Sequence, residues 1–359
     1  RIDSLLGLWS SSGISAVHMH EQWTESEGYP KTTKFTREFK SLVDGCNAVG
    51  MRLMPYIGFQ LGDNTPEYAL YKNEVVVEPF VEERGFNRGD HLGQDICYAG
   101  QYQNFMLYNI DKLIREYGIG GLYMDGTCIP PRCKNLSHGC GYYDRKGRLQ
   151  PSYPIFEYRR FFKRIRTLAL KYRPDFWMDM HTTVGVWTPV NSFGDSIWKG
   201  EQICMLAGQH GGSVREILDL DAIRAGMGRQ YGHPIYFLNY DQMDDVASVC
   251  AVMDIPLRLD GGLRSKVLKH FGTAESVLHP YWKNQGTIHA ADARTYVSYW
   301  KRPDGALLLA VSNLSNSQPS IQESIRFDSK LELDPDCVAS DATSGERLSM
   351  HNNTLELPL

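Results

Sequence analysis

The sequence predicts a parallel α/β fold, a (β/α)8 barrel, followed by a small antiparallel β-sandwich. Two patterns predict the barrel: short apolar strands alternate with long helical segments over residues 1–289, and acidic or histidine side chains end many of these strands. A third observation predicts the sandwich, because from residue 290 the chain changes to alternating strands joined by tight turns. We therefore expect a barrel domain over 1–289 and a β-sandwich domain over 290–359, which ends abruptly at Leu359.

Seven strand-and-helix units can be counted in the first part of the chain. Strands are expected near residues 15, 51, 121, 175, 196, 234 and 256, and helices over 2–12, 34–49, 101–117, 153–172, 214–231 and 245–253. Because the chain opens on a helix, the first strand of an eight-unit barrel is expected before Arg1, or else as an irregular strand that the pattern does not reveal. A doubly wound open sheet is the alternative fold, but no Gly-x-Gly-x-x-Gly follows the first strand.

The last part of the chain reads as a series of hairpins. An alternating strand over 295–301 leads through Pro303-Asp304-Gly305 into a partner strand over 306–312. Further short strands are expected over 320–327, 337–342 and 354–357.

Composition excludes some classes of function. The chain has 359 residues, of which 42% are hydrophobic and 22% are charged, as in an ordinary globular protein. Its net charge of -4 and pI near 6.3 offer no basic surface for nucleic acid. No apolar run is long enough for a membrane span. We predict no cofactor, and the oligomeric state cannot be read from the sequence.

The first residues, Arg1 to Trp9, read as the middle of an amphipathic helix with no Met before it. This beginning fits a processed protein or an excised fragment, and no signal-peptide pattern opens the chain. We expect an extracytoplasmic location, either periplasmic or secreted.

The stretch from Gly118 to Gly126 reads as a buried strand that ends in a carboxylate, Asp125. In a (β/α) barrel the strands run toward one mouth, so a charged residue at a strand's carboxyl end lies in the active-site face. The alternative is a structural turn, because Asp-Gly is an ordinary turn dipeptide.

Other strand ends carry side chains of similar chemistry. They are His18, His20, Glu21, Tyr56, Asp179, His181, Lys199, Glu201, Asn239, Asp241 and Asp260, with Trp23, Trp187 and Trp198 nearby. Carboxylates and aromatic rings at one mouth suit a sugar, which offers hydroxyls to the acids and apolar ring faces to Trp. Two carboxylates across a glycosidic bond are the minimum set for its hydrolysis.

Four segments together resemble a glycoside-hydrolase barrel with a C-terminal β-sandwich. They are His20-Glu21-Gln22-Trp23, Gly120 to Gly126, Asn135 to Gly141 and Tyr296 to Leu314. The chain resembles bacterial relatives of β-N-acetylgalactosaminidases and, more distantly, the α-galactosidase-like retaining barrels. The resemblance covers most of the chain, although Gly-Leu-Tyr-x-Asp occurs in several glycosidase families and a fold does not determine a function.

The resemblance implies a retaining glycosidase with Asp125 as nucleophile and Glu201 as acid/base, where Asp is usual. Acetamido-sugar enzymes use an adjacent Asp-Glu pair, and Gly126 in place of that Glu argues against an N-acetylhexosamine substrate. The implied carbohydrate-binding residues are His18, His20, Glu21, Trp23, Tyr56, Asp179, His181, Lys199, Asn239 and Asp241.

Three alternatives remain open. Asp179 or Asp241 could replace Glu201 as acid/base, because each ends a neighbouring strand. His18, His20, His181 and Asp260 are similar to the ligands of metal-dependent amidohydrolase barrels, although Lys199 and Glu201 stand where that family has a further His. The third alternative is a barrel that binds glycans without cleaving them.

Eight cysteines are present, and three of them lie close together in the sequence. Cys128, Cys133, His138 and Cys140 could hold zinc, but their spacing lacks the paired Cys-x2-Cys of common zinc modules. We favour a disulfide or buried thiols. Cys46 and Cys250 lie in helical patterns and are expected in the core.

Overall fold

The structure is a computed structural model that describes most of the chain. The described residues are 2–20, 22–77, 86–87, 91–127, 130–182, 185–209, 212–227, 232, 234–239, 244–257, 263–284, 286–315 and 320–359. They fall into two compact units, Arg1–Trp198 and Lys199–Leu359. The domain boundary expected between residues 289 and 290 stays a prediction.

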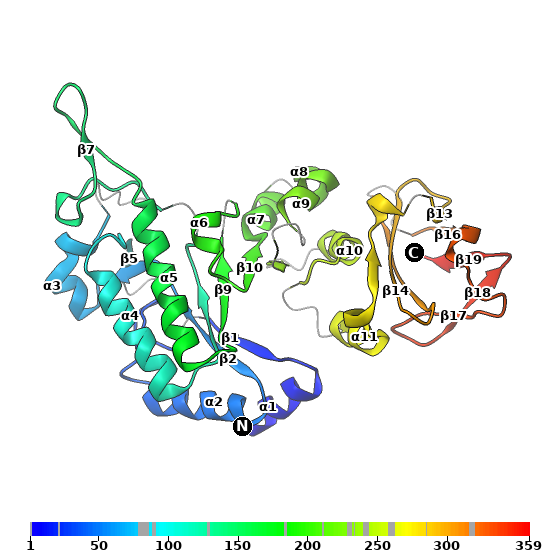
Figure 1. The fold of residues 1–359 in the computed structure, drawn as a ribbon, viewed down its shortest axis with the longest axis horizontal. Helices are drawn as coiled ribbons and strands as arrows, with labels where there is room; N and C mark the ends of the chain where they lie inside the picture. The colour runs from blue at the N-terminus through cyan, green and yellow to red at the C-terminus, as the bar shows by residue number, and fades with distance from the viewer. Residues whose placement is uncertain are drawn as a thin grey trace. The chain divides into compact units, whose positions relative to one another are not determined.

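A curled parallel sheet forms the centre of the first unit (Figure 1). Its strands lie in the order β1 (Ala16–Met19), β2 (Arg52–Ile57), β6 (Gly121–Met124), β9 (Trp177–His181) and β10 (Ser196–Lys199). Each neighbouring pair is parallel. The sheet and its helices fit a TIM-like barrel, as predicted.

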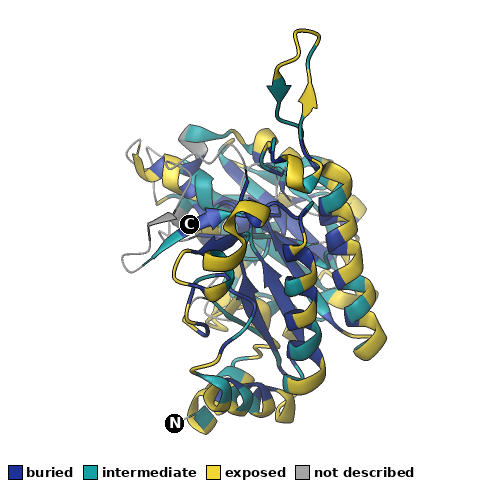
Figure 2. Ribbon diagram, turned by 90° about the vertical axis from the view of Figure 1, so that its left-hand side faces the viewer, coloured by how far each residue is buried: buried dark blue, intermediate teal, exposed yellow. Residues whose placement is uncertain are grey.

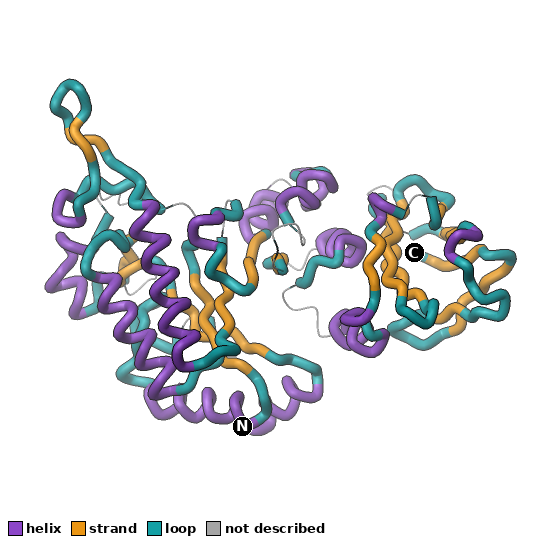
Figure 3. Tube along the Cα trace, in the orientation of Figure 1, coloured by secondary structure: helices purple, strands orange, loops and turns teal. Residues whose placement is uncertain are grey.

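Helices cover one face of this sheet, as the tube trace shows (Figure 3). They are α1 (Ile2–Ser11), α2 (Thr36–Ala48), α3 (Pro66–Val75), α4 (Tyr102–Lys112), the π-helical turn η2 (Leu113–Tyr117), α5 (Ile155–Tyr172) and α6 (Thr188–Asn191). Helix α2 illustrates why they pack, because Phe39, Val43 and Cys46 recur at helical spacing and are all buried. Figure 2 shows the buried strands behind helices whose outward faces are exposed.

Short antiparallel elements decorate the first unit. A three-stranded sheet has the order β3 (Gln60–Gly62), β5 (Leu92–Asp95) and β4 (Phe86–Asn87). The 3-10 turn η3 (Leu136–His138) and the hairpin of β7 (Tyr142–Tyr143) and β8 (Leu149–Gln150) lie in the connection that follows β6. Both elements therefore belong to the long loop after the candidate nucleophile.

The two faces of the parallel sheet differ in chemistry. In β9, Met178 and Met180 belong to the apolar core shared with the helices. Because side chains alternate along a strand, Asp179 and His181 lie on the opposite face. The same alternation places Tyr123 of β6 opposite the core, so this second face collects polar and aromatic groups.

The second unit begins with helices. They are α7 (Glu201–Gln209), α8 (Val214–Ile217), α9 (Leu220–Gly226), α10 (Asp244–Met253) and α11 (Leu263–Phe271). Between α9 and α10 lies the strand β11 (Ile235–Phe237). Its last residue, Phe237, forms a parallel bridge to Leu257. Where a strand was predicted near residue 256, the described residues form a parallel bridge at Leu257, and residues 258–262 lie outside the described part of the chain.

Two antiparallel sheets complete the second unit. The first has the order β12 (Val277–His279), β14 (Thr295–Lys301) and β15 (Leu307–Asn313). The second has the order β13 (Ile288–Ala290), β16 (Gln322–Phe327), β19 (Thr354–Pro358), β18 (Arg347–His351) and β17 (Ala339–Ser340). The antiparallel pairing is confirmed, and their arrangement as a β-sandwich stays a prediction.

Short 3-10 turns link these strands, namely η4 (Thr273–Glu275), η5 (Tyr281–Lys283) and η6 (Ser329–Leu331). Helix α10 packs beside the first sheet, where the hydroxyl of Ser312 donates to the carbonyl of Ser248 at 2.8 Å. Asp219 interrupts the helix expected over 214–231, because its carboxylate caps α9 by accepting from the backbone N–H of Ala222. No helix among the described residues is long and apolar enough to cross a membrane.

Candidate active site

Asp125 directly follows β6, and three groups hold its carboxylate. Oδ2 accepts from the hydroxyl of Tyr56 at 2.6 Å. Oδ1 accepts from the backbone N–H of Gly126 at 2.6 Å and lies 2.9 Å from Nδ1 of His181. The Asp125 side chain keeps 17% of its surface exposed, so it remains accessible to a small group.

These contacts decide the charge of Asp125. Burial alone raises its pKa, but the hydrogen bond and charge of His181, together with the donors Tyr56 and Gly126, outweigh burial and bring the pKa below 3.8. Asp125 is therefore an anion at neutral pH. An ionised, partly exposed carboxylate at the carboxyl end of a barrel strand has the chemistry of a nucleophile or of an electrostatic stabiliser.

Strand register explains why these three residues meet. Tyr56 pairs with Tyr123 between β2 and β6, and Tyr123 pairs with Asp179 between β6 and β9. Two residues further along each strand, the same face presents Asp125 and His181. The carbonyl of His181 also accepts from the backbone N–H and the hydroxyl of Thr127, which joins the ends of β6 and β9.

Gly126 is required by its backbone and by its surroundings. Its φ of +66° lies in the left-handed region, which residues other than glycine rarely adopt. A Cβ there would lie 2.1 Å from the ring of Phe59. The glycine therefore permits the turn that presents its N–H to Asp125.

Asp179 is a second acid on the same face, but it is buried and held by three side chains. Nε2 of His18 and the hydroxyl of Ser196 contact its two oxygens, and Nε1 of Trp177 donates to Oδ1 at 2.6 Å. Only 4% of Asp179 is exposed. This arrangement suits a residue that positions β1, β9 and β10 better than one that exchanges protons with a substrate.

Tyr123 lies at the centre of an aromatic group on this face. Its ring centroid is 4.8 Å from that of His18, 5.7 Å from that of Tyr56 and 6.0 Å from that of Trp198. The ring of His20 lies 4.3 Å from that of Tyr56. Sequence reasoning missed Tyr123, although its place two residues before Asp125 was a signal that both share a face.

Trp23 is in the core rather than among these rings. It is 1% exposed, its indole N–H donates to the carbonyl of Tyr56 at 2.9 Å, and its ring lies 4.9 Å from that of Phe39. The structure gives this predicted substrate-binding residue a packing role, because both its ring and its N–H have partners inside the protein.

The remaining described candidates belong to the second unit. Lys199 ends β10, and its Nζ donates to the carbonyl of Gly226 at 3.0 Å, while burial lowers its pKa. Glu201 does not end a strand, because β10 stops at Lys199 and Glu201 is the first residue of α7. Asn239 is buried and accepts from the thiol of Cys204. Glu21, Asp241 and Asp260 lie outside the described residues.

Across the described part of the chain, one group of His, Cys, Asp or Glu side chains brings its ligand atoms close enough for a metal ion. It consists of Cys97, Cys133, His138 and Cys140. Cys133 and Cys140 are buried and form no disulfide with another described cysteine, which agrees with one of the two predicted states, and Cys128 lies outside the described residues. Cys97 was missed because it stands far from the others in the sequence.

Comparison with known proteins identifies similarity of fold. No protein-family model and no curated protein sequence matches the chain. A noncanonic maltogenic α-amylase from Thermotoga neapolitana has a TM-score of 0.62 at 10% identity, covering 100% of this chain and 91% of that one. For an α-amylase from Lactobacillus plantarum the TM-score is 0.61 at 10% identity, covering 100% and 93%.

A GH36 α-galactosidase from Geobacillus stearothermophilus is also similar, with a TM-score of 0.52 at 10% identity. The match covers 99% of this chain and 52% of that one. At this level of identity the likeness concerns the fold alone. The chain therefore shares its barrel-like fold with these two α-amylases and this α-galactosidase.

Proposed function

We propose that this protein is a retaining glycoside hydrolase in which Asp125 is the nucleophile. The observation that carries the proposal is the set of contacts on Asp125, which holds an ionised and partly exposed carboxylate at the end of β6. The fold likeness to amylases and α-galactosidases supports the reaction class. The aromatic group around Tyr123 offers apolar faces beside this carboxylate, as sugar recognition requires.

Hydrolysis by such an enzyme takes two steps. In the first, an oxygen of Asp125 bonds to the anomeric carbon as the bond to the leaving oxygen breaks, and a carboxylic acid gives its proton to that oxygen. In the second, water attacks the anomeric carbon, the bond to Asp125 breaks and frees its carboxylate, and the acid group, now itself a carboxylate, takes the proton of the water. The resemblance stated above assigns this acid/base role to Glu201, as a proposal.

The substrates to test first are α-linked oligosaccharides and polysaccharides. The similar structures are described as α-amylases, a debranching enzyme and α-galactosidases. N-acetylgalactosaminides come second, because Gly126 stands where the acetamido-sugar enzymes have a Glu. An extracytoplasmic location fits such polymeric substrates and is part of the same proposal.

Mechanism-based trapping tests the role of Asp125. The protein is incubated with activated 2-deoxy-2-fluoro glycosides of α-glucose, α-galactose and their β-anomers, and its peptides are analysed by mass spectrometry. We expect one fluoroglycosyl adduct on the peptide that contains Asp125, and no adduct in Asp125→Asn. An adduct on another carboxylate would contradict the assignment, and NMR of the first-formed product would show retention or inversion.

Glu201→Gln tests the acid/base role separately. Its turnover should fall strongly for natural glycosides and much less for dinitrophenyl glycosides, whose leaving group needs no proton. Equal losses on both substrates would contradict the role of Glu201. Tight binding of oligosaccharides with no turnover by the unmodified protein would instead support a glycan-binding barrel.

The amidohydrolase alternative makes a different prediction about metal. His18 contacts Asp179 through Nε2, so this strand-end histidine is already engaged by a carboxylate. A metal ion lost on His20→Ala, together with metal-dependent amidase activity, would favour that alternative. Metal that is retained in His20→Ala would count against it.

A further inference from the structure

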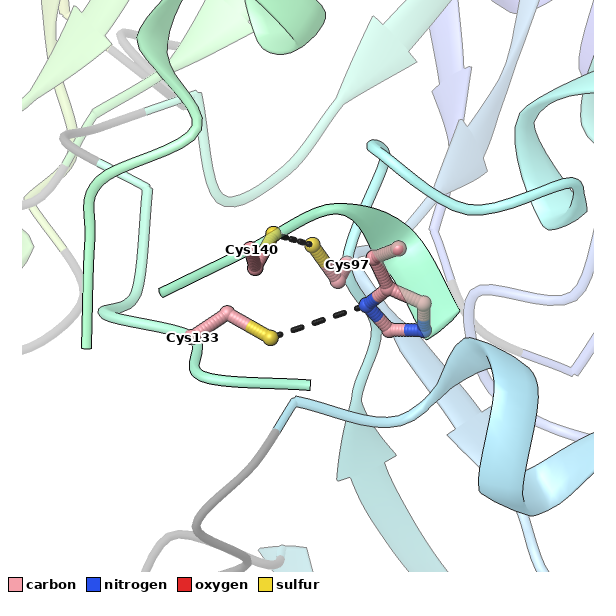
Figure 4. A group of neighbouring side chains, drawn as sticks. Cys97, Cys133 and Cys140 are labelled. Atoms are coloured by element: carbon pink, nitrogen blue, oxygen red, sulfur yellow. Dashed lines mark hydrogen bonds between the residues drawn. The ribbon is translucent and has the colours of Figure 1, made fainter. Parts of the chain in front are cut away.

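Three cysteines and a histidine converge in the first unit. None of them is among the residues that hold Asp125. The four side chains are Cys97, Cys133, His138 and Cys140, and their ligand atoms all lie within 4.8 Å of one another. In Figure 4 the sulfurs of the three cysteines point toward one another. Cys97 follows β5, whereas the other three belong to the loop after β6.

Two of the separations within this cluster equal those expected between ligands of one tetrahedral zinc ion. Sγ of Cys97 lies 3.7 Å from Sγ of Cys140, and Sγ of Cys133 lies 3.6 Å from Nδ1 of His138 (Figure 4). Zinc bonds of ordinary length place two sulfurs about 3.8 Å apart and a sulfur and a nitrogen about 3.6 Å apart. A disulfide would need sulfurs about 2.05 Å apart, so Cys97 and Cys140 are not bonded to each other, and their spacing fits two ligands of one ion.

His138 is oriented as a metal ligand. Its Nε2 contacts the backbone carbonyl of Glu74, an acceptor that fixes the ring proton on Nε2. The lone pair of Nδ1 therefore faces Cys133. Metal-binding histidines usually donate their second N–H to such an acceptor, which fixes the tautomer and the ring orientation.

The backbone around the cysteines is built to hold them. Cys133 pairs with Ser152 through two backbone hydrogen bonds of 2.9 Å, and the N–H of Asn135 donates to Sγ of Cys133 at 3.4 Å. The amide of Asn135 also donates to the carbonyl of Asn73 at 2.7 Å. A Cβ at Gly100 would lie 2.8 Å from the carbonyl of Glu74 and 3.2 Å from the His138 ring, so a glycine is needed there.

Burial also points to a closed site. Cys97 and Cys133 are fully buried and Cys140 is 3% exposed. Among the described residues, Val77 and Ala99 are the further apolar members of the cluster that they form. Three buried thiols whose sulfurs lie close to one another and to an imidazole nitrogen have the chemistry of ligands of one ion.

We propose that Cys97, Cys133, His138 and Cys140 form a structural zinc site. Thiolates and imidazole are the ligands that zinc prefers, and four protein ligands leave no open position for catalysis. Binding releases the three thiol protons and leaves a site of net charge -1. The metal would link Cys97, which follows β5, to the loop after β6. Because that loop begins next to Asp125, we expect loss of the metal to affect activity through the loop.

Metal analysis tests the proposal. The protein is expressed in zinc-supplemented medium and purified without chelator. We expect one zinc per chain that survives dialysis, and we expect Co²⁺ in its place to give the intense visible bands of tetrahedral thiolate coordination. These measurements use the unmodified protein, so they do not depend on whether any variant folds. Absence of zinc, with a Cys97–Cys140 disulfide found by mass spectrometry under non-reducing conditions, would overturn the proposal.

Variants assign the ligands. Cys97→Ser, Cys133→Ser and His138→Gln should each lose the zinc and unfold at a lower temperature. Cys337→Ser and His351→Gln should keep the full zinc content, because both residues lie outside the cluster. Zinc that persists in His138→Gln and Cys97→Ser at wild-type affinity would show an adventitious ion and overturn the proposal. The zinc content is independent of glycosidase activity, so the two proposals can fail separately.

Discussion

The hydroxyl of Tyr56 and Oδ2 of Asp125 are 2.6 Å apart and join the carboxyl ends of β2 and β6. Burial raises the pKa of Tyr56, and the negative charge of Asp125 raises it further, so Tyr56 stays a donor. A donor that cannot ionise stabilises the anionic form of its acceptor. Tyr56 is therefore a positioning and charge-stabilising partner of Asp125.

Replacing Tyr56 by Phe should remove this donor and raise the pKa of Asp125. The acidic limb of the pH–activity profile should then move to higher pH, because a larger fraction of Asp125 is protonated at a given pH. At neutral pH we expect kcat/KM to fall about tenfold or more, since a hydrogen bond to a charged group contributes roughly 1.5–3 kcal/mol. The measurement is the pH profile on an aryl glycoside.

Tyr142→Phe is the matched control, because Tyr142 is exposed on the β7 strand. Its profile should match that of the unmodified protein. A Tyr56→Phe profile with an unmoved acidic limb would show that Tyr56 does not set the charge of Asp125.

Gly126→Ala should damage both stability and the site. Alanine would carry the cost of a positive φ, roughly 1–2 kcal/mol, together with a clash against the Phe59 ring. Gly13→Ala isolates the first effect, because Gly13 has a φ of +76° with no atom within 4 Å of its Cβ position. We expect Gly126→Ala to lower the free energy of unfolding by about 2 kcal/mol more than Gly13→Ala in urea titrations. Equal losses would mean that the Phe59 ring moves aside.

Much of the first unit follows from sequence patterns. The apolar strand of Gly121–Met124 between a helix and a lone acid predicts a parallel barrel strand, and the structure has one. Tyr56, Asp125 and His181 were each selected as strand-end residues, and the structure brings them together. Parallel strands end at one edge, so a period-two pattern and a strand direction are sufficient for this prediction.

The contacts themselves could not be predicted. The choice of Tyr56 and His181 as the partners of Asp125 depends on strand register, which cannot be derived from the sequence alone. Trp23 reads like a sugar platform, but its loop turns the indole into the core. Cys97 joins the cysteine cluster through the fold, because β5 and the loop after β6 are separated by a long stretch of sequence.

Asp179→Ala should destabilise the first unit, because it removes a buried carboxylate that accepts hydrogen bonds inside the protein. The substitution removes the acceptor of the Ser196 hydroxyl, while the Trp177 N–H keeps the Ser196 oxygen at 3.1 Å as its other acceptor, and the loss costs about 1–3 kcal/mol. Asp175→Ala is the control, because Asp175 is 56% exposed and its pairs with Arg52 and Arg173 are each worth about 0–1 kcal/mol. Thermal unfolding would measure both. A loss of turnover with unchanged stability would instead restore Asp179 as an acid/base candidate.

Asp125 should also make stability depend on pH in acid. Its folded pKa is lowered from 3.8, so the charged form contributes stability above the unfolded value, and this contribution is lost as pH falls through the folded pKa. Asp125→Asn lacks this titration. Unfolding temperatures of the two proteins should therefore differ most above pH 3.8, by about a few degrees at most, and should converge as the pH falls through the folded pKa of Asp125. Asp3→Asn on α1 is the control, because Asp3 is exposed, and its curve should run parallel to that of the unmodified protein. Curves for Asp125→Asn that stay parallel at every pH would show that the contacts of Tyr56, Gly126 and His181 do not favour the carboxylate, and the ionised nucleophile would lose its physical basis.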